Sequence, residues 1–166
     1  MNILKLIQED HVKVKELFKA VEKTTVRGLK TRKELFDKIY DTLTVHTTSE
    51  EETLYSPLTT YGDSRDQVLE GYEEHHVANL LLNELQDMPL DDERWLSKLV
   101  VLRENIEHHV KEEERDLFGD ARKHFTPSAL EQMGAIFLAR KDELLMKRAI
   151  PLLNEKHLDF GMLGSG

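Results

Sequence analysis

The sequence predicts an all-α protein: an up-down-up-down antiparallel four-helix bundle followed by an additional C-terminal helix. Apolar residues recur at steps of three and four along most of the chain, which is the spacing of a helix face packed in a bundle. No segment shows the alternating spacing that is typical of a β-strand. Because the breaks between the helical stretches are short, consecutive helices are expected to pack antiparallel.

A small set of helix breakers separates the first four helical stretches. Gly28 lies between the first and second stretches. Pro57 and Gly62 end the second stretch, and Pro89 ends the third. The fourth stretch is expected to run to about His124.

Residues with capping side chains mark the expected helix starts. Capping boxes, in which Ser or Thr precedes Glu or Gln by three residues, occur at 31–34 and 64–67 and predict the starts of the second and third helices. Asp91 is a candidate cap for the fourth helix. Thr126 and Pro127 read as the N-cap and first residue of the fifth.

The fifth helix is predicted to reach about Ala149 and to stop at Pro151. We therefore expect one domain over residues 1–150, and a frayed tail over residues 151–166, which closes with the sequence GMLGSG.

Composition limits the classes of function. The chain has 166 residues, of which 39% are apolar, so it can form one domain with a real core. It contains no cysteine, which excludes disulfides, thiolate metal sites and a cysteine nucleophile. The net charge of -9 makes nucleic acid and anionic membranes unfavourable partners. The apolar runs are too short to span a membrane and the N-terminus is too polar for a secretory signal, so we expect a cytoplasmic protein.

One ten-residue motif occurs twice. The segment 46–55 reads HTTSEEETLY and the segment 109–118 reads HVKEEERDLF, so both contain His-x-x-x-Glu-Glu and end in Leu plus an aromatic residue. A His and a Glu four residues apart lie on one face of a helix, one turn apart. In both copies this face is otherwise apolar, with Leu43 and Leu54 flanking the first pair and Ile106 and Leu117 flanking the second.

Carboxylates in such an apolar seam point to a metal ion. Burying a carboxylate costs several kcal/mol, roughly, unless a charge or hydrogen-bond partner offsets the cost. His11 and His75 also lie in apolar seams, on the first and third helices, so each of the four bundle helices directs one His inward. Because Asp10-His11 and Glu74-His75 are similar too, the chain reads as a helical hairpin of roughly 64 residues that occurs twice. Four His and two Glu can hold two first-row metal ions; iron, manganese and zinc all suit these ligands.

These four motifs resemble those of the hemerythrin-like HHE cation-binding domain family. The resemblance covers about residues 1–150 and rests on the order and spacing of Asp10-His11, His46-x-x-x-Glu50-Glu51, Glu74-His75 and His109-x-x-x-Glu113-Glu114. It implies a non-haem di-iron centre, with two iron ions (Fe2+/Fe3+) joined by an oxo or hydroxo bridge inside the bundle. It also implies the metal ligands: terminal His11, His46, His75 and His109, and bridging Glu50 and Glu113.

Two departures from the oxygen-carrying members are informative. Those proteins place two His one turn apart on the third helix, whereas here Gly71 and Asn79 lie one turn before and after His75. The open coordination positions favour sensing, peroxide or nitrogen-oxide chemistry, or iron handling, over simple oxygen storage. The carriers also place the fourth-helix carboxylate five residues after the His, so Glu114 stays an alternative to Glu113 as the bridge.

Several neighbouring residues are further candidates for the site. Glu51 and Glu114 are expected to be solvated surface residues, and Tyr72 a core aromatic. Participation of Tyr72 or Asn79 in the site stays open. The aromatic residues that end the two motifs, Tyr55 and Phe118, are expected to pack over the site.

Three functions are compatible with the sequence. The first is a di-iron protein that binds or reacts with dioxygen, peroxide or nitric oxide in a sensing, stress or redox role. The second is an iron-storage or iron-sensing module without turnover. The third is a metal-free helical interaction protein in which His and Glu pair only with each other. No catalytic side chain can be named, so the sequence leaves open whether the protein is an enzyme.

Overall fold

The computed structural model describes the backbone of residues 1–161 and the side chains of residues 1–149. These residues form helices and connecting turns, without a strand. The elements in chain order are α1 (Ile3–Glu22), α2 (Leu29–Glu50), η1 (Glu51–Tyr55), α3 (Ser56–Leu58), α4 (Arg65–Asp87), α5 (Trp95–Glu112), η2 (Glu113–Leu117), α6 (Phe118–His124) and α7 (Pro127–Gly161).

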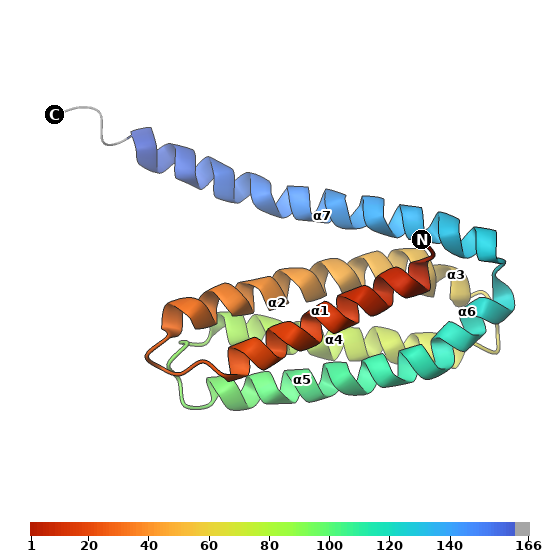
Figure 1. Ribbon diagram of the computed structural model, residues 1–166, viewed down its shortest axis with the longest axis horizontal. Coiled ribbons are helices and arrows are strands. Elements are labelled where there is room, and N and C mark those ends of the chain that lie inside the picture. The colour runs from red at the N-terminus through yellow and green to blue at the C-terminus, as the bar shows by residue number, and fades with distance from the viewer. Residues whose placement is uncertain (162–166) are drawn as a thin grey trace.

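Four helical segments form an antiparallel bundle, which confirms the predicted fold (Figure 1). The elements α2, η1 and α3 follow one another without a break, as do α5, η2 and α6, so each trio is one long segment. Within the bundle, α1 packs on α2 and α5, while α4 packs on α5 and α2. The spatial order is therefore a closed ring, α1–α2–α4–α5. In the part of the chain that the structure describes, no helix combines the length and apolar character needed to cross a membrane.

Each repeat contains one π-helical turn, and it begins directly after or at the seam glutamate. The turn η1 follows Glu50, and η2 begins at Glu113. A π-helical turn has extra residues relative to an α-helical turn, so it shifts the face that points inward. As a result the consecutive residues Leu54 and Tyr55 are both fully buried, and the same holds closely for Leu117 and Phe118.

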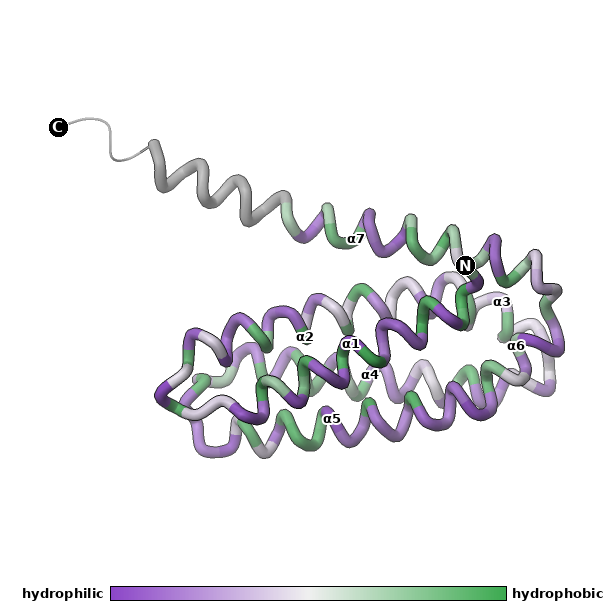
Figure 2. Tube along the Cα trace, viewed as in Figure 1, coloured by the Kyte–Doolittle hydropathy of each residue, from purple (hydrophilic) through white to green (hydrophobic). Residues whose placement is uncertain are grey.

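Two apolar cores lie on either side of the layer that contains the His and Glu motifs. One core joins the N-terminal end of α1 to the motif ends and α7, and includes Leu54, Phe118 and Phe137. The other fills the opposite half of the bundle and includes Phe18, Phe36 and Trp95. Along the bundle helices, apolar and polar residues alternate with the helical period (Figure 2). The polar layer is thus closed by apolar packing at both ends.

The predicted capping interactions were mostly wrong. The helix α2 begins at Leu29, ahead of the 31–34 box, and its N-cap Gly28 has no side chain to cap it. Ser64 is the N-cap of α4 as predicted, but its side chain makes no capping hydrogen bond. The helix α5 begins at Trp95 rather than after Asp91, because a turn over 89–95 delays it. The prediction at Thr126 is confirmed, since its hydroxyl accepts the backbone N–H of Ala129 at 3.2 Å.

The predicted end of the fifth helix was also wrong. The helix α7 continues through Pro151 to Gly161, and residues 162–166 of the expected tail lie outside the described residues. A proline inside a helix removes one backbone hydrogen bond and introduces a clash with the preceding turn. It does not by itself reverse the chain, and helix propagation is favourable once a long helix has formed.

The helix α7 packs across α1 and α2 through a narrow stripe (Figure 1). Leu130, Gly134, Phe137 and Lys141 are spaced by four, three and four residues, so they share one face. Leu130 and Phe137 are buried. Gly134 lies where α7 crosses the N-terminus of α1, and a Cβ atom there would lie 2.4 Å from the carbonyl oxygen of Met1. The absence of a side chain at Gly134 therefore permits this close contact.

We expect Gly134→Ala to destabilise the protein by about 1–3 kcal/mol, because the added methyl group forces α7 away from backbone atoms that cannot yield. The control is Gly119→Ala on α6, where a Cβ atom would have nothing within 4 Å and where alanine raises helix propensity. Urea unfolding followed by circular dichroism measures both. Equal stability of Gly134→Ala and the wild type would contradict this packing.

Candidate metal centre

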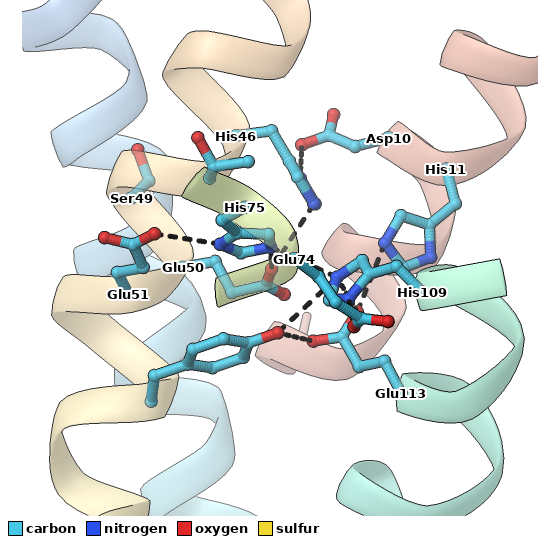
Figure 3. A network of polar contacts seen from close by, with 12 residues as sticks. Asp10, His11, His46, Ser49, Glu50, Glu51, Glu74, His75, His109 and Glu113 are labelled. Atoms are coloured by element: carbon cyan, nitrogen blue, oxygen red, sulfur yellow. Dashed lines mark hydrogen bonds and ion pairs between the residues drawn. The ribbon is translucent and has the colours of Figure 1, made fainter. Parts of the chain in front are cut away.

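The six predicted ligands come together in one buried layer of the bundle (Figure 3). His11 comes from α1, His46 and Glu50 from α2, His75 from α4, and His109 and Glu113 from the α5–η2 segment. None of the six is more than 8% exposed. The i,i+4 spacing places each Glu one turn beyond the His of its own helix, and the antiparallel packing brings the other two His to the same level.

The inward-facing atoms form two groups, one around each glutamate. Glu50 Oε2 lies 3.4 Å from His46 Nε2 and 3.5 Å from His75 Nε2. Glu113 Oε2 lies 3.3 Å from His11 Nε2 and 3.9 Å from His109 Nε2. The two groups adjoin each other, since 3.1 Å separates the Nε2 atoms of His75 and His109. Two carboxylates between two pairs of imidazoles form a donor set that suits metal cations.

Several of these buried atoms lack a hydrogen-bond partner among the described residues. They are His11 Nε2, both side-chain oxygens of Glu50, and Glu113 Oε2. Buried polar atoms in folded proteins are nearly always paired, and each exception requires a physical reason such as an ion. Here the unpaired atoms are the ones that face one another at the centre of the layer. The donor set therefore fits a bound metal, and Glu50, His75 and His109 in particular have ligand atoms within 4.8 Å of one another.

The outer nitrogen of every one of these imidazoles contacts a carboxylate. Because an ionised carboxylate can only accept, each Nδ1 carries the proton and donates it. In the neutral form of this tautomer, which is the form that binds a metal ion, an imidazole directs its Nε2 lone pair toward the centre. The four bonds are His46 to Asp10 (3.1 Å), His75 to Glu51 (2.9 Å), His109 to Glu74 (2.7 Å) and His11 to Glu114 (2.8 Å).

These four hydrogen bonds run once around the bundle, and we call them the carboxylate ring. In each bond the carboxylate belongs to one helix and the imidazole to the next, in the order α1, α2, α4, α5 and back to α1. Every carboxylate of the ring is adjacent in sequence to one of the six inward-facing residues. The ring therefore orients all four imidazoles and also joins each pair of neighbouring helices.

Burial and charge set the ionisation of the layer in the metal-free chain. Burial and the nearby charge of Glu113 raise the pKa of Glu50 well above its usual value. Burial would raise the pKa of Glu113 as well, but His11 and His109 outweigh it and lower that pKa. Burial lowers the pKa of His46 to about 4, so its imidazole is neutral at pH 7. Burial opposes protonation of His11, but Glu113 and Glu114 raise its pKa to about 9.

Tyr55 brings a hydroxyl group to the edge of the layer. Its ring is fully buried and stacks on His75 with centroids 5.2 Å apart. The hydroxyl donates to Glu113 Oε1 at 3.2 Å and lies 3.5 Å from His109 Nε2. A Cβ atom at Gly71 would lie 2.8–2.9 Å from this phenol ring and hydroxyl. Tyr55 therefore fills the space that a side chain at position 71 would need.

Part of this arrangement differs from what the sequence predicted. Glu51 and Glu114 were expected on the solvated surface, but they accept hydrogen bonds from His75 and His11, so this expectation was wrong. They point toward the neighbouring helix because one residue of helix rotates a side chain by roughly 100° from the seam. The signal that could have found them is the repetition itself, since an acid adjoins the same motif position in both copies.

The remaining candidates lie outside the inward-facing set. Glu113, and not Glu114, occupies the position between the imidazoles. Tyr72 packs edge-on against Tyr55, and its hydroxyl donates to the backbone carbonyl of Glu51 at 3.4 Å. Asn79 is half-buried on α4 and makes no hydrogen bond with the six residues in the described part of the chain. Phe118 packs in the apolar core, as expected.

The helix α7 reaches the layer from one side only. Lys141 donates to Asp10 at 2.6 Å, and Asp10 accepts from His46. The buried Phe137 ring packs edge-on against His46 with centroids 6.3 Å apart. The other three carboxylates of the ring lack a comparable cation from α7 among the described contacts. We call the α1–α2 hairpin the first half of the bundle and the α4–α5 hairpin the second half. The two halves therefore have different surroundings despite their similar motifs.

The fold and the buried donor set define a class of protein: a helical bundle that binds metal cations between its four helices. The comparison with protein families agrees, because residues 2–121 match the model of the hemerythrin HHE cation binding domain. The chain belongs to this family.

Two known proteins are similar to this chain. A protein from Nostoc sp. (strain PCC 7120) named DNA nickase is 30% identical over 145 residues, which are 87% of this chain and 40% of that protein. This chain therefore spans well under half of the relative's length. The crystal structure of a hemerythrin HHE cation binding domain-containing protein from Mycobacterium kansasii, described as a Rv2633c homolog, superposes with a TM-score of 0.79. It is 23% identical, and the match covers 92% of both chains, which shows the shared fold.

Replacing a carboxylate of the ring is expected to weaken metal binding. We expect Glu51→Gln to lower metal affinity by about ten- to hundred-fold, because His75 loses its charged acceptor and its orientation. The matched control is Glu52→Gln, the next residue, which pairs with Arg140 on the surface. Competition with a chromophoric chelator measures both affinities. If the two variants bind metal equally well, the carboxylate ring does not support the site.

Proposed function

We propose that the chain holds two iron ions in the buried layer and presents them to dioxygen, peroxide or nitric oxide in a sensing, stress or redox role. The observation that carries the proposal is the set of unpaired, inward-facing atoms of Glu50, Glu113 and His11 in a layer closed by apolar cores. His11, His46, His75 and His109 would be terminal ligands, with Glu50 and Glu113 between the ions. Bound iron would supply one-electron redox chemistry and Lewis acidity.

The residues around the layer support binding of a small neutral ligand. A pocket of about 430 Å³ opens between α1 and α5 and reaches His11. Its walls include the apolar side chains of Val14, Phe18, Ile106 and Val110. Four charged side chains also line this pocket: Lys15, Glu107, Lys111 and Glu114. Its apolar wall suits diatomic molecules, which need no hydrogen-bond partners on the way. The surrounding apolar cores also keep bulk water from the layer, which strengthens electrostatic interactions there.

Tyr55 is proposed to act as a hydrogen-bond donor to a ligand bound in the layer. Its ring fills the space beside Gly71, one of the two positions one turn from His75, and its hydroxyl is directed at the layer. Burial and the charge of Glu113 raise the pKa of Tyr55 well above its usual value, so the phenol keeps its proton. In the absence of a ligand, the Tyr55 hydroxyl donates its hydrogen bond to Glu113.

The metal content tests the proposal directly. Protein purified without added metal or chelator is expected to contain about two irons per chain, as six donors of this type can hold two first-row ions. His46→Leu with Glu50→Leu should lose this iron. The control is Lys33→Leu with Asp37→Leu, which removes an exposed i,i+4 ion pair from the same helix. A folded wild-type chain that takes up no iron on reconstitution would contradict the proposal and favour a metal-free interaction protein.

Reaction of the reduced, iron-loaded protein then separates redox work from storage. A stoichiometric change in the visible spectrum on addition of dioxygen, peroxide or nitric oxide supports the redox or sensing role. Iron that is taken up beyond two ions per chain, or released to a mild chelator without such a reaction, supports an iron-storage or iron-sensing module.

A conservative substitution tests the role of Tyr55. We expect Tyr55→Phe to retain its iron but to bind nitric oxide about five-fold more weakly, because one hydrogen bond contributes about 1 kcal/mol. Tyr72→Phe is the control, since that hydroxyl contacts only the backbone of Glu51. Nitric oxide titration of the reduced proteins gives the affinities. Loss of iron from Tyr55→Phe would show that the phenol oxygen itself is needed as a ligand.

The name of the Nostoc relative raises a nucleic-acid function, which we do not extend to this chain. This chain spans 40% of that protein, so the named activity concerns a larger molecule. The net charge of -9 opposes binding to a phosphate backbone. We therefore propose that nucleic acid is not a partner of the domain itself.

A further inference from the structure

The two halves of the bundle have different kinds of side chain at several equivalent positions that surround the repeated motifs. Aligning His75 with His11 and His109 with His46 makes positions in one half equivalent to positions in the other. In the first half these positions are occupied by small or apolar side chains, all buried, on the side that α7 covers: Ile3, Leu6, Ile7, Ser49 and Thr53. In the second half the equivalent positions are polar, acidic or lack a side chain, and they line a pocket: Gln67, Glu70, Gly71, Glu112 and Asp116.

This pocket, of about 190 Å³, leads from the surface to the metal layer between α4 and the α5–η2 segment. Tyr55, His109 and Glu113 lie at its inner end. The Glu113 side chain is 1% exposed, and its Oε2 atom has no hydrogen-bond partner among the described residues. The pocket is lined by five acidic side chains and by one cation, Arg115, which pairs with Asp116 and Glu112. A buried carboxylate oxygen without a hydrogen-bond partner at the inner end of this mainly acidic passage favours a cation as the occupant.

Two residues of the pocket wall, Glu74 and Glu112, belong to a second group of possible metal ligands, which His108 completes from outside the wall. Glu74, His108 and Glu112 have ligand atoms within 4.8 Å of one another. His108 Nε2 lies 3.5 Å from a carboxylate oxygen of Glu112 and 3.9 Å from Glu74 Oε1. The His108 side chain is 63% exposed, so this outer group is open to solvent.

Glu74 belongs to both the outer group and the carboxylate ring. Its Oε1 atom faces His108, whereas its Oε2 atom accepts from His109 at 2.7 Å. One carboxylate thus spans the distance between the exposed group and an imidazole of the buried layer. The equivalent residue of the first half, Asp10, is instead covered by Lys141 of α7. Among the described contacts no cation of α7 covers Glu74, and the cation on this pocket wall, Arg115, pairs instead with Asp116 and Glu112.

We propose that this pocket is the route by which divalent metal reaches the buried layer, and that Glu74, His108 and Glu112 form an outer site that holds the cation in transit. The proposal rests on the proposed function, because it requires a metal in the buried layer. A helix from a partner protein, packed as α7 packs on the first half, is disfavoured because the exposed positions here are acidic rather than apolar. Negative clefts concentrate cations and speed their association by about ten-fold or more.

The rate of metal uptake tests the route separately from the final metal content. The test variant is His108→Gln with Glu112→Gln, which removes two members of the outer group and leaves the carboxylate ring intact. Apo protein is mixed with Fe2+ under anaerobic conditions, and uptake is followed in a stopped-flow instrument. We expect about ten-fold slower uptake by the variant, an unchanged final iron content, and a wild-type rate that falls as salt is added.

The control is His76→Gln with Glu104→Gln, which makes the same chemical changes at exposed positions outside the pocket. A second variant, Glu70→Gln with Asp116→Asn, changes the pocket wall if the first one folds poorly. Equal uptake rates for the test and control variants would overturn the proposed route. A wild-type chain that binds no iron at any rate would instead contradict the proposed function, and the route with it.

Discussion

The carboxylate ring is the interaction on which the rest of this structure depends. Four imidazoles each donate one proton to a carboxylate of the preceding helix, so the bonds close around the bundle. Charge-assisted hydrogen bonds of this kind are roughly twice as strong as neutral ones. They fix the tautomer of each imidazole and also the relative positions of neighbouring helices. The same four hydrogen bonds therefore determine both the geometry of the layer and the packing of the bundle helices.

The layer is costly in the absence of metal, and the surrounding structure shows how that cost is accommodated. Glu50 and Glu113 are both buried, and two negative charges so close together repel each other. As a result the pKa of Glu50 is raised while that of Glu113 is lowered. One π-helical turn follows Glu50 and the other begins at Glu113, and they bring Tyr55 to the layer and Phe118 into the adjoining apolar core. Such turns are rare, and they occur often at functional sites.

Much of this could be predicted from the sequence because it depends on helical periodicity. The steps of three and four residues identified the bundle, and the i,i+4 pairs placed four of the six inward-facing residues. The apolar seams of the first and third helices placed the other two, His11 and His75. Helix ends were less predictable, since the turn before Trp95 and the continuation through Pro151 depend on the surroundings and not on capping motifs. Glu51 and Glu114 were missed because periodicity assigns each helix a seam and a solvent face, whereas these side chains reach sideways to the next helix. The π-helical turns have no distinct sequence spacing.

The difference between the two halves follows from what α7 covers. Two identical hairpins would have two equivalent faces, and on each face a carboxylate would accept a hydrogen bond from an imidazole of the layer. In the first half, Lys141 neutralises that acid and Phe137 closes the face. In the second half, Glu74 keeps one oxygen free of α7 and facing the pocket. A closed face contributes core packing and stability, and an open face leaves the buried donors accessible. In this chain α7 covers one face and leaves the other open, so core packing and access to the buried donors are divided between the two halves.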